Sequence, residues 1–422
     1  MEGIILFGAF ALLIIIGVPI SASLGISALA TFIFCGIPLA AIPQRIFTSL
    51  DSFSIMAIPF FILAGNLMTA GGISQRIVHF TNSVVGKVRG GMAVACVAGC
   101  AFFAALSGSS PATVIAIGSM LYPEMVEMGY PKHEAAGLIA VSGGLGPIIP
   151  PSIIMVVYAT TVGCSVTEMF VAGATCGIFI AIALAVVTIF IAYKKGYPRN
   201  EKRYTFKSWM KILYQAFPAL ILPFIIIGGI VSGLFTPTES AVVSVIYAMI
   251  VALFIYKSIK FRDLWKVFLD SAKASAIVLF IMGTSSAFAW IFTSSGISSS
   301  LVQAIAAMNL SKGLFLVMVA VILLIFGTFM EGVATTLLLI PVFLPIANSF
   351  GIHPVHLGMI MSISTVVGGV TPPVALNIFA ASSFTKLRLE DISRGEIPWL
   401  ITLTAAFLVI VFVPGLSLLL IG

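Results

Sequence analysis

The sequence predicts an all-α polytopic membrane protein. Three observations predict it: few charged residues, long apolar runs and an internal repeat. Of the 422 residues, 60% are hydrophobic and 8% are charged, whereas a soluble domain is about half apolar and roughly a quarter charged. Several apolar runs approach or exceed the ~20 residues that cross a bilayer core as a helix. They must be helical, because lipid satisfies no backbone polar group. These runs are Gly3–Cys35, Met169–Tyr193, Ile212–Ser232 and Trp399–Ile421.

The rest of the composition argues against other classes. The net charge of +7 does not indicate nucleic-acid binding, because the basic residues are spread over short loops rather than along one stripe. The segment Met1-Glu2-Gly3 lacks the basic region of a cleavable signal peptide, so the first apolar run is expected to remain as an anchor. The five cysteines form no CxxC pair and are predicted to be packing residues rather than disulfide or zinc ligands. They are Cys35, Cys96, Cys100, Cys164 and Cys176.

The charges of the loops predict the topology. The positive-inside rule places the basic segment Lys194–Lys211 in the cytoplasm, and spans can be counted outward from it in both directions. The count places 19 of the 21 Lys and Arg residues inside and leaves Arg45 and Lys312 outside. In this count a span over 274–294 runs from the cytoplasm to the outside.

This charge bias depends on two segments that do not cross the membrane. Residues 92–127 and 313–350 must each enter and leave on the same side. The topology therefore predicts two re-entrant helical hairpins, the first opening to the cytoplasm and the second to the periplasm.

An internal repeat relates the two halves. An offset of 222 residues pairs glycines, prolines and hydroxyl residues in a constant order. The pairs include Thr113 with Thr335, Pro123 with Pro345, Gly146 with Gly368, and Pro150-Pro151 with Pro372-Pro373. Because the hairpins open to opposite sides, the repeats are inverted, an architecture typical of secondary transporters. A fainter match at offset 218 pairs Pro19 with Pro237 and predicts two short spans within residues 3–36.

Interruptions of the apolar segments are predicted to carry the chemistry. In the first half, Ser107–Thr113 interrupts the hairpin, and Gly143–Pro151 breaks the next helix with three prolines, which remove amide donors. Such backbone survives at membrane depth only when it is buried in protein or lines a wet cavity. Uncharged oxygens suit Na⁺ at half-helix C-terminal ends, while half-helix N-termini face an anionic group. The second half repeats the pattern at Gly327–Thr336 and Gly368–Pro373.

A simpler alternative is that these interruptions are proline kinks and small-residue packing sites. Glu331 and Glu239 are the acidic residues closest to membrane depth; each is a candidate proton carrier, or else caps a half-helix or lies at the interface. The four histidines are expected in loops at span ends, without a ligand cluster. They are His79, His133, His353 and His356. No GxxxxGK[ST] pattern, nucleophile–base pair or metal cluster is present, so neither ATP hydrolysis nor enzyme catalysis is expected.

Four stretches resemble the large membrane (M) subunit of TRAP (tripartite ATP-independent periplasmic) transporters, within the ion-transporter superfamily. They are Ala105–Thr113, Gly144–Ser152, Phe235–Ser240 and Gly369–Asn377, and the resemblance runs nearly end to end. It implies an elevator-type, Na⁺-driven carrier in the bacterial inner membrane that takes up a carboxylate solute such as a C4-dicarboxylate, sialic acid or another sugar acid. It also implies two partners, a small four-helix membrane subunit and a soluble periplasmic binding protein. No small-subunit segment precedes Met1, so an unfused large subunit is expected.

The resemblance also implies site residues, with at least two Na⁺ ions held largely by carbonyl oxygens. The first Na⁺ would lie among Ser107, Ser110, Gly146, Ile149 and Pro151. The second would lie among Gly327, Met330, Gly332, Gly368, Thr371 and Pro373. Substrate would lie between the hairpin tips, near Ser109, Thr113, Glu331, Thr335 and Asn377.

An elevator divides into a moving part, made of the hairpins and broken helices, and a scaffold. Scaffold helices are expected over 1–46 and 212–273. The first inverted repeat is expected over 47–193, with its hairpin at about 90–128 and its broken helix over 133–162. The second is expected over 274–422, with its hairpin at about 313–350 and its broken helix over 356–383. Residues 194–211 are expected to form an amphipathic cytoplasmic connector with Trp209 at the interface.

Two other functions fit the same residues. A stand-alone Na⁺- or H⁺-coupled carboxylate carrier of the same superfamily would need no partners. An ion channel is the other alternative, because two hairpins that meet in the membrane could resemble a pore.

Overall fold

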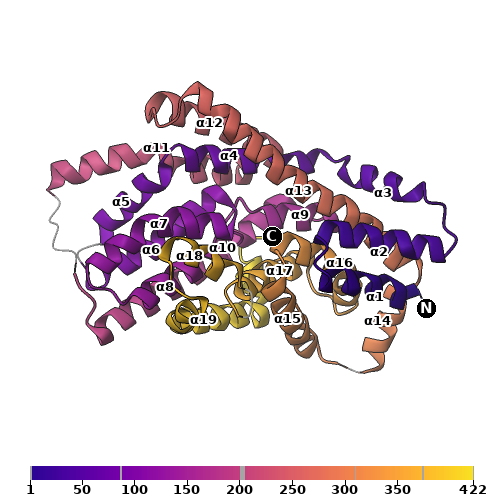
Figure 1. Ribbon diagram of the computed structural model, residues 1–422. Helices are drawn as coiled ribbons and strands as arrows, with labels where there is room; N and C mark the ends of the chain where they lie inside the picture. The colour runs from indigo at the N-terminus through magenta and orange to yellow at the C-terminus, as the bar shows by residue number, and fades with distance from the viewer. Residues whose placement is uncertain (1, 86–87, 200–204, 309, 373–374, 422) are drawn as a thin grey trace.

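The computed structural model describes residues 2–85, 88–199, 205–308, 310–372 and 375–421. Over these residues the protein is helical and has no β-strand (Figure 1). Many breaks between helices fall at glycine or proline, because glycine readily adopts positive φ and proline cannot donate the hydrogen bond that continues a helix.

The amino-terminal helices are short. α1 (Glu2–Ile15) and α2 (Ile20–Phe34) are separated near Gly17, which has a φ of 83°. The first apolar run thus forms two short helices, the division that the match at offset 218 predicts. α3 (Ala41–Leu50) follows, and a 3₁₀ turn, η1 (Phe53–Met56), leads into α4 (Ala57–Ala70) and α5 (Ile73–Val85).

Two groups of helices share one order. In the first, Gly108 and Ser109 join a helix pair, residues 144–152 interrupt the next helix, and a long helix follows. Its members are α6 (Gly91–Ser107), α7 (Ser110–Glu127), α8 (Lys132–Gly143), α9 (Ile153–Val162) and α10 (Val166–Lys195). The second group has the same order and ends in a short additional helix. Its members are α15 (Lys312–Phe329), α16 (Gly332–Ser349), α17 (Pro354–Gly369), α18 (Leu376–Thr385), α19 (Leu389–Phe412) and α20 (Pro414–Leu418).

The helices between these groups include the longest of the described chain. They are α11 (Phe206–Val231), α12 (Pro237–Ile250) with its π-helical extension η2 (Val251–Ile255), α13 (Phe261–Ser294) and α14 (Ile297–Ala307). α13 has 34 residues and is therefore about 51 Å long at 1.5 Å per residue. It begins before the predicted 274, because the Asp263 carboxylate accepts a hydrogen bond from the Lys260 amide (2.8 Å) and caps its first turn.

The segment predicted as a connector, 194–211, does not form an element of its own in the described residues. Lys194 and Lys195 lie in the last turn of α10, and Phe206 begins α11. Trp209 is therefore part of α11 and is half-buried. Residues 200–204 lie outside the described part of the chain.

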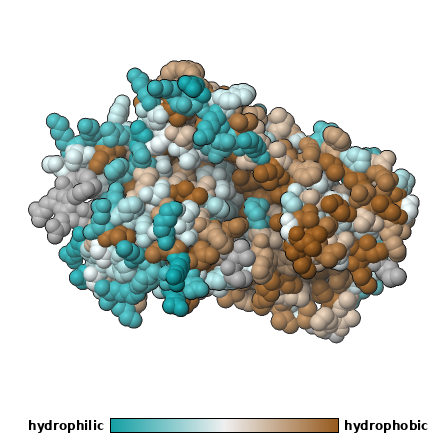
Figure 2. Space-filling model, in the orientation of Figure 1, coloured by the Kyte–Doolittle hydropathy of each residue, from teal (hydrophilic) through white to brown (hydrophobic). Residues whose placement is uncertain are grey.

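The protein is a multi-pass membrane protein. Among the described residues, eight helical segments are long and apolar enough to cross a bilayer. They are Phe53–Ala70, Val166–Lys195, Phe206–Val231, Pro237–Ile255, Phe261–Ser294, Lys312–Phe329, Gly332–Ser349 and Leu389–Phe412. Figure 2 shows hydrophilic residues gathered toward the end where α5 and α8 lie in Figure 1, and apolar residues over the end where α1, α2 and α14 lie.

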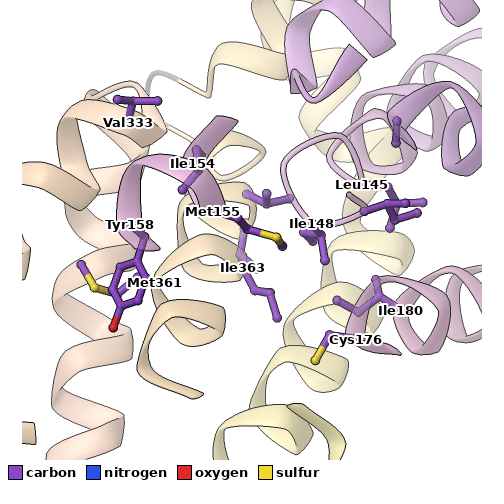
Figure 3. Close-up of a cluster of buried hydrophobic side chains, with 14 of the residues drawn as sticks. Leu145, Ile148, Ile154, Met155, Tyr158, Cys176, Ile180, Val333, Met361 and Ile363 are labelled. Carbon is purple, nitrogen blue, oxygen red and sulfur yellow. The ribbon is translucent and has the colours of Figure 1, made fainter. Parts of the chain in front are cut away.

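The interior is built around α8 and α17. Every residue of α17 from Val355 to Gly369 is buried, and so is every residue of α8 from Glu134 to Gly143. Figure 3 shows how α9 and the interruption before it pack between α10, α16 and α17, with Met155 and Ile148 facing this core. The Tyr158 hydroxyl in the same cluster donates a hydrogen bond of 2.7 Å to the Pro354 carbonyl at the start of α17.

The backbones of α8 and α19 touch. A Cβ atom on Gly137 would lie 2.4 Å from the backbone nitrogen of Glu396, and one on Gly395 would lie 2.0 Å from the carbonyl oxygen of His133. Both distances are far shorter than van der Waals contact. Only glycine at both positions permits this packing.

We expect Gly395→Ala to force α8 and α19 apart and to lower the free energy of unfolding by about 1–3 kcal/mol, as overpacked interiors do. The measurement is the midpoint of thermal unfolding of the purified protein in detergent. Gly8→Ala in α1 is the matched control, because no atom lies within 4 Å of its Cβ position. A Gly395→Ala protein that melts like the wild type would contradict the backbone contact.

Candidate functional site

The turn between α6 and α7 lies against the interruption between α8 and α9. Gly108, with a φ of 58°, ends α6, and a Cβ there would lie 2.7 Å from the Pro151 carbonyl oxygen. A Cβ on Gly146 would lie 2.6 Å from the Ser109 carbonyl oxygen. These approaches require glycine, so the turn and the interruption form one cluster.

Within the described chain, carbonyl oxygens of this interruption lack backbone donors. Among the described residues, no backbone amide donates to the carbonyls of residues 146–151. For residues 146 and 147 the cause lies in the sequence, because Pro150 and Pro151 lack the amides that would donate to the carbonyls four residues earlier. The Ser107 hydroxyl lies at the neighbouring turn, 2.8 Å from the Thr113 hydroxyl.

A second close contact joins α15 to α17. A Cβ on Gly368 would lie 2.7 Å from the Cα of Gly327. α15 then ends in extended backbone at Met330, which is buried. At the end of α17 the Thr371 hydroxyl donates a hydrogen bond of 2.6 Å to the Val367 carbonyl. The end of α15 is thereby held against the last turns of α17.

Asn377, in the first turn of α18, connects the two halves. Its side-chain oxygen accepts a hydrogen bond of 2.7 Å from the Ser110 hydroxyl at the start of α7. Its side-chain nitrogen donates one of 3.1 Å to the Ala140 carbonyl on α8. Because Asn377 is buried, both bonds are shielded from water, and they fix α18 against the first half.

Both turns, Pro147 of the first interruption and the helix ends that flank the second line a cavity of about 100 Å³, which holds only a few water molecules at roughly 30 Å³ each. The lining includes the starts of α7, α9, α16 and α18, at Ser110, Ile153, Gly332 and Leu376. Four helix N-termini therefore surround one small space. The positive dipole ends of these helices favour an anionic group.

The four N-termini differ in their caps. Glu331 accepts hydrogen bonds from the amides of Val333 (3.0 Å) and Ala334 (3.3 Å), so its carboxylate caps α16. Ser152 caps α9 in the same way. No side-chain hydrogen bond caps α7 or α18. The starts of α7 and α18 are therefore the ends most open to a ligand.

The structure separates the residues predicted to bind substrate. Ser109, Glu331 and Asn377 line the cavity, whereas Thr113 and Thr335 do not. Both threonines are fully buried, and their hydroxyls donate to the carbonyls of Ser109 (2.8 Å) and Glu331 (3.1 Å) in their own helices. Sequence spacing cannot show this, because either threonine hydroxyl can bond its own helix or a ligand.

The residues predicted to bind cations divide in the same way. In the first set, Ser110 lines the cavity, and Ser107, Gly146, Ile149 and Pro151 lie in the turn and interruption beside it. In the second set, Gly327, Met330 and Gly332 line the cavity, and Gly368 and Thr371 lie at the end of α17. Pro373 lies outside the described residues. Within the described part, no group of three or more His, Cys, Asp or Glu residues could hold a metal.

Both glutamates named as candidate proton carriers act as helix caps. Glu331 caps α16, and Glu239 caps α12 by accepting a hydrogen bond of 2.8 Å from the Thr236 amide. The expectation that the histidines lie in loops is wrong for His356, which is buried within α17 and lies 2.7 Å from the Ser417 hydroxyl. His79 and His133 are also helical.

Sequence reasoning missed three residues. Val278 of α13 and Thr365 of α17 line the cavity, but neither stands beside a Gly or Pro interruption. Glu396 on α19 is fully buried, and neither carboxylate oxygen has a hydrogen-bond partner among the described residues. The apolar run of the sequence begins only at Trp399, so Glu396 falls before it. Its position inside α19 depends on the contact with α8.

Comparison with known proteins agrees with this architecture. Residues 7–416 match the family described as the tripartite ATP-independent periplasmic transporter, DctM component. The C4-dicarboxylate TRAP transporter large permease protein DctM of Rhodobacter capsulatus is 41% identical, over 99% of this chain and 98% of that protein. The isethionate TRAP transporter permease protein DctMQ of Oleidesulfovibrio alaskensis is 39% identical, over 98% of this chain and 65% of that protein.

A solved structure shares the fold at low sequence identity. The YdaH transporter of Alcanivorax borkumensis superposes with a TM-score of 0.65 and 15% identity, over 89% of each chain. At this identity the likeness concerns the fold alone. The family match over nearly the whole sequence carries the assignment: the chain belongs to the DctM component of the tripartite ATP-independent periplasmic transporters, as a membrane permease and not an enzyme.

Proposed function

We propose that this permease subunit couples Na⁺ to the uptake of a carboxylate solute through the cavity between its two helix pairs. One observation carries the proposal: the uncapped N-termini of α7 and α18 meet at a cavity beside the free carbonyls of residues 146–151. The N-termini suit a carboxylate, and the uncharged oxygens suit a monovalent cation. A C4-dicarboxylate is the first substrate to test, because the Rhodobacter capsulatus relative is named for it; sialic acid and other sugar acids follow.

The proposal includes two inverted repeats with re-entrant hairpins. Helix bounds support it, because α7 spans residues 110–127 and α16 spans 332–349, which differ by the sequence offset of 222. The turns of both helix pairs line the same cavity. Helices that meet end-on at one site, from halves of opposite topology, fit the transporter architecture in which substrate binds at the repeat interface.

A second pair of contacts supports the repeat. Glu134, at the start of α8, accepts hydrogen bonds from Lys195 (2.5 Å) and Tyr197. Burial raises the pKa of Tyr197, so its hydroxyl stays protonated and can donate. The offset of 222 carries Glu134 to His356 and Lys195 to Ser417, and those two residues also bond to each other. The start of each broken helix is thus bonded, within its own half, to the residue that lies 61 positions later in the sequence.

We propose an elevator motion for this division into two parts. The helix pairs and the broken helices would move as one body past a scaffold of the remaining spans, which includes α13, whose Val278 reaches the cavity. A small membrane subunit would hold the scaffold in place, and a soluble periplasmic protein would deliver substrate. The relative named DctMQ supports a partner of the first kind. A stand-alone carrier of the same superfamily is the alternative, and it would transport without either partner.

The decisive experiment is uptake of labelled succinate into proteoliposomes that contain this chain and a small TRAP membrane subunit from the same source. We expect uptake to require both an inward Na⁺ gradient and the soluble binding protein. Removal of Na⁺, with K⁺ as the replacement, should abolish it. Uptake with Na⁺ alone would favour the stand-alone carrier, and conduction without saturation would indicate a channel.

We expect Ser110→Ala to raise the Na⁺ concentration for half-maximal uptake by roughly 5- to 10-fold, the effect of losing one oxygen ligand worth about 1 kcal/mol. The readout is the initial rate of uptake against Na⁺ concentration. Ser300→Ala is the control, because Ser300 is exposed and its hydroxyl bonds only its own helix at Gly296. Unchanged Na⁺ activation in well-folded Ser110→Ala would remove Ser110 from the cation site.

We expect Gly146→Ala to push the interruption away from the Ser109 carbonyl and to reduce uptake roughly 10-fold or more, because the strain of overpacking is about 1–3 kcal/mol. Uptake is compared at equal amounts of reconstituted protein. Gly228→Ala is the control, since no atom lies within 4 Å of its Cβ position on α11. Normal uptake by Gly146→Ala would show that this close approach is not needed for transport.

A further inference from the structure

A second cavity lies beside the candidate site and is lined by a basic side chain, Arg45, whose predicted position outside the cytoplasm has no explanation in the loop charges. It has a volume of about 460 Å³ and is lined by residues of α3, α9, α13 and α16 and of the segment between α3 and α4. Figure 1 shows α3 beside the carboxyl-terminal half of α13. Arg45 lines this cavity and is one of only two basic residues that the topology leaves outside. The positive-inside rule gives Arg45 no role there, so a local cause is needed.

The cavity suits an anion electrostatically. Of the described residues that line it, Arg45 is the only charged one. The ion pairs found within the described ranges all involve Glu134, so none neutralises Arg45. Asp51, which follows α3, is exposed and does not line the cavity. A guanidinium at the mouth of a cavity without acidic groups leaves its donors for a carboxylate.

The guanidinium group of Arg45 is also held in one orientation by an aromatic ring. Its Cζ lies 4.9 Å from the centre of the Trp290 ring, a cation–π contact that holds the planar guanidinium over the indole. A stacked guanidinium loses less side-chain freedom when it binds a carboxylate through two parallel hydrogen bonds. Trp290 belongs to α13 and lines the same cavity.

Hydroxyl groups supply further donors. Thr48 on α3, Ser52 between α3 and η1, and Ser286 on α13 line the cavity. Ser285 lines it as well; it is only 3% exposed, and in the described part of the structure its hydroxyl has no hydrogen-bond partner. A buried hydroxyl without a partner is costly. A ligand oxygen in the cavity would satisfy it.

The cavity lies on the outer side of the candidate site. Both are lined by α9, α13 and α16, but the candidate site uses Val278 and Val333, whereas this cavity uses Met282 and Leu337. Met282 follows Val278 on α13, and Leu337 follows Val333 on α16, by four residues each. Four residues are about 6 Å along a helix, in the direction of its C-terminus. In the predicted topology α13 runs from the cytoplasm outward, so the step leads toward the periplasm. Met282 and Leu337, both buried, lie on the side nearest the candidate site.

We propose that the cavity around Arg45 is an outer carboxylate-binding site, where an organic anion binds at the periplasmic face one helical turn from the candidate transport site. This inference rests on the proposed function for its direction across the membrane. The binding itself depends only on Arg45, Trp290 and the hydroxyl lining, so it can be measured without transport.

The test is a fluorescence titration of the purified full chain in nanodiscs of zwitterionic lipid with sodium succinate, against sodium chloride at equal ionic strength. Trp290 is the reporter, because it lies under Arg45. We expect a saturable change in emission that is absent in Trp290→Phe. In Arg45→Gln the concentration for half-saturation should rise roughly 5- to 10-fold, the effect of losing one charge-assisted contact at a partly exposed site. Arg45→Lys, which keeps the charge without the planar fork, should be intermediate.

The same variants in the uptake assay separate this inference from the proposed function. Arg45→Gln should raise the KM for succinate. A wild-type protein that gives the Trp290 signal but no succinate uptake would overturn the proposed function and leave the outer site standing. Intact uptake, with no saturable Trp290 signal or with the same titration for wild type and Arg45→Gln, would overturn the outer site alone.

Discussion

The structure depends on one constraint: backbone that leaves a helix inside an apolar interior must still have its polar groups satisfied. The described chain leaves helical geometry at four places around one cavity, at the two turns within the helix pairs and at the ends of α8 and α17. At each place glycine allows another backbone to approach, or proline removes an amide that would otherwise need a partner. Carbonyls and helix N-termini are left over, and these are the groups that a cation and an anion would satisfy.

Side chains from distant parts of the sequence then fix this arrangement. Asn377 bonds Ser110 and Ala140 across the two halves, and Tyr158 bonds the start of α17. These buried hydrogen bonds help to set the register between the halves. Replacing one partner would leave the other buried and unsatisfied, which costs more than the bond itself contributes.

The sequence predicts the interruptions well and the contacts between them poorly. Gly108, Gly146 and the paired prolines have local conformational effects that can be recognised without tertiary information, and the helices of the structure end close to them. The orientations of Thr113 and Thr335 cannot be predicted in this way, because a hydroxyl on a helix can bond its own backbone. Glu396 and His356 were missed for a related reason, since the burial of a polar residue depends on the helix that covers it.

The backbone contact between α8 and α19 has a mechanical consequence. Where two helices meet through side chains, the layer between them can deform, because rotamers shift and the axes slide. Gly137 and Gly395 leave no such layer, so α8 and α19 are in rigid backbone contact. A displacement applied at the far end of α19 reaches the interruption after α8 without being absorbed on the way. The cavity wall formed by the interruption after α8 is therefore stiffly coupled to α19.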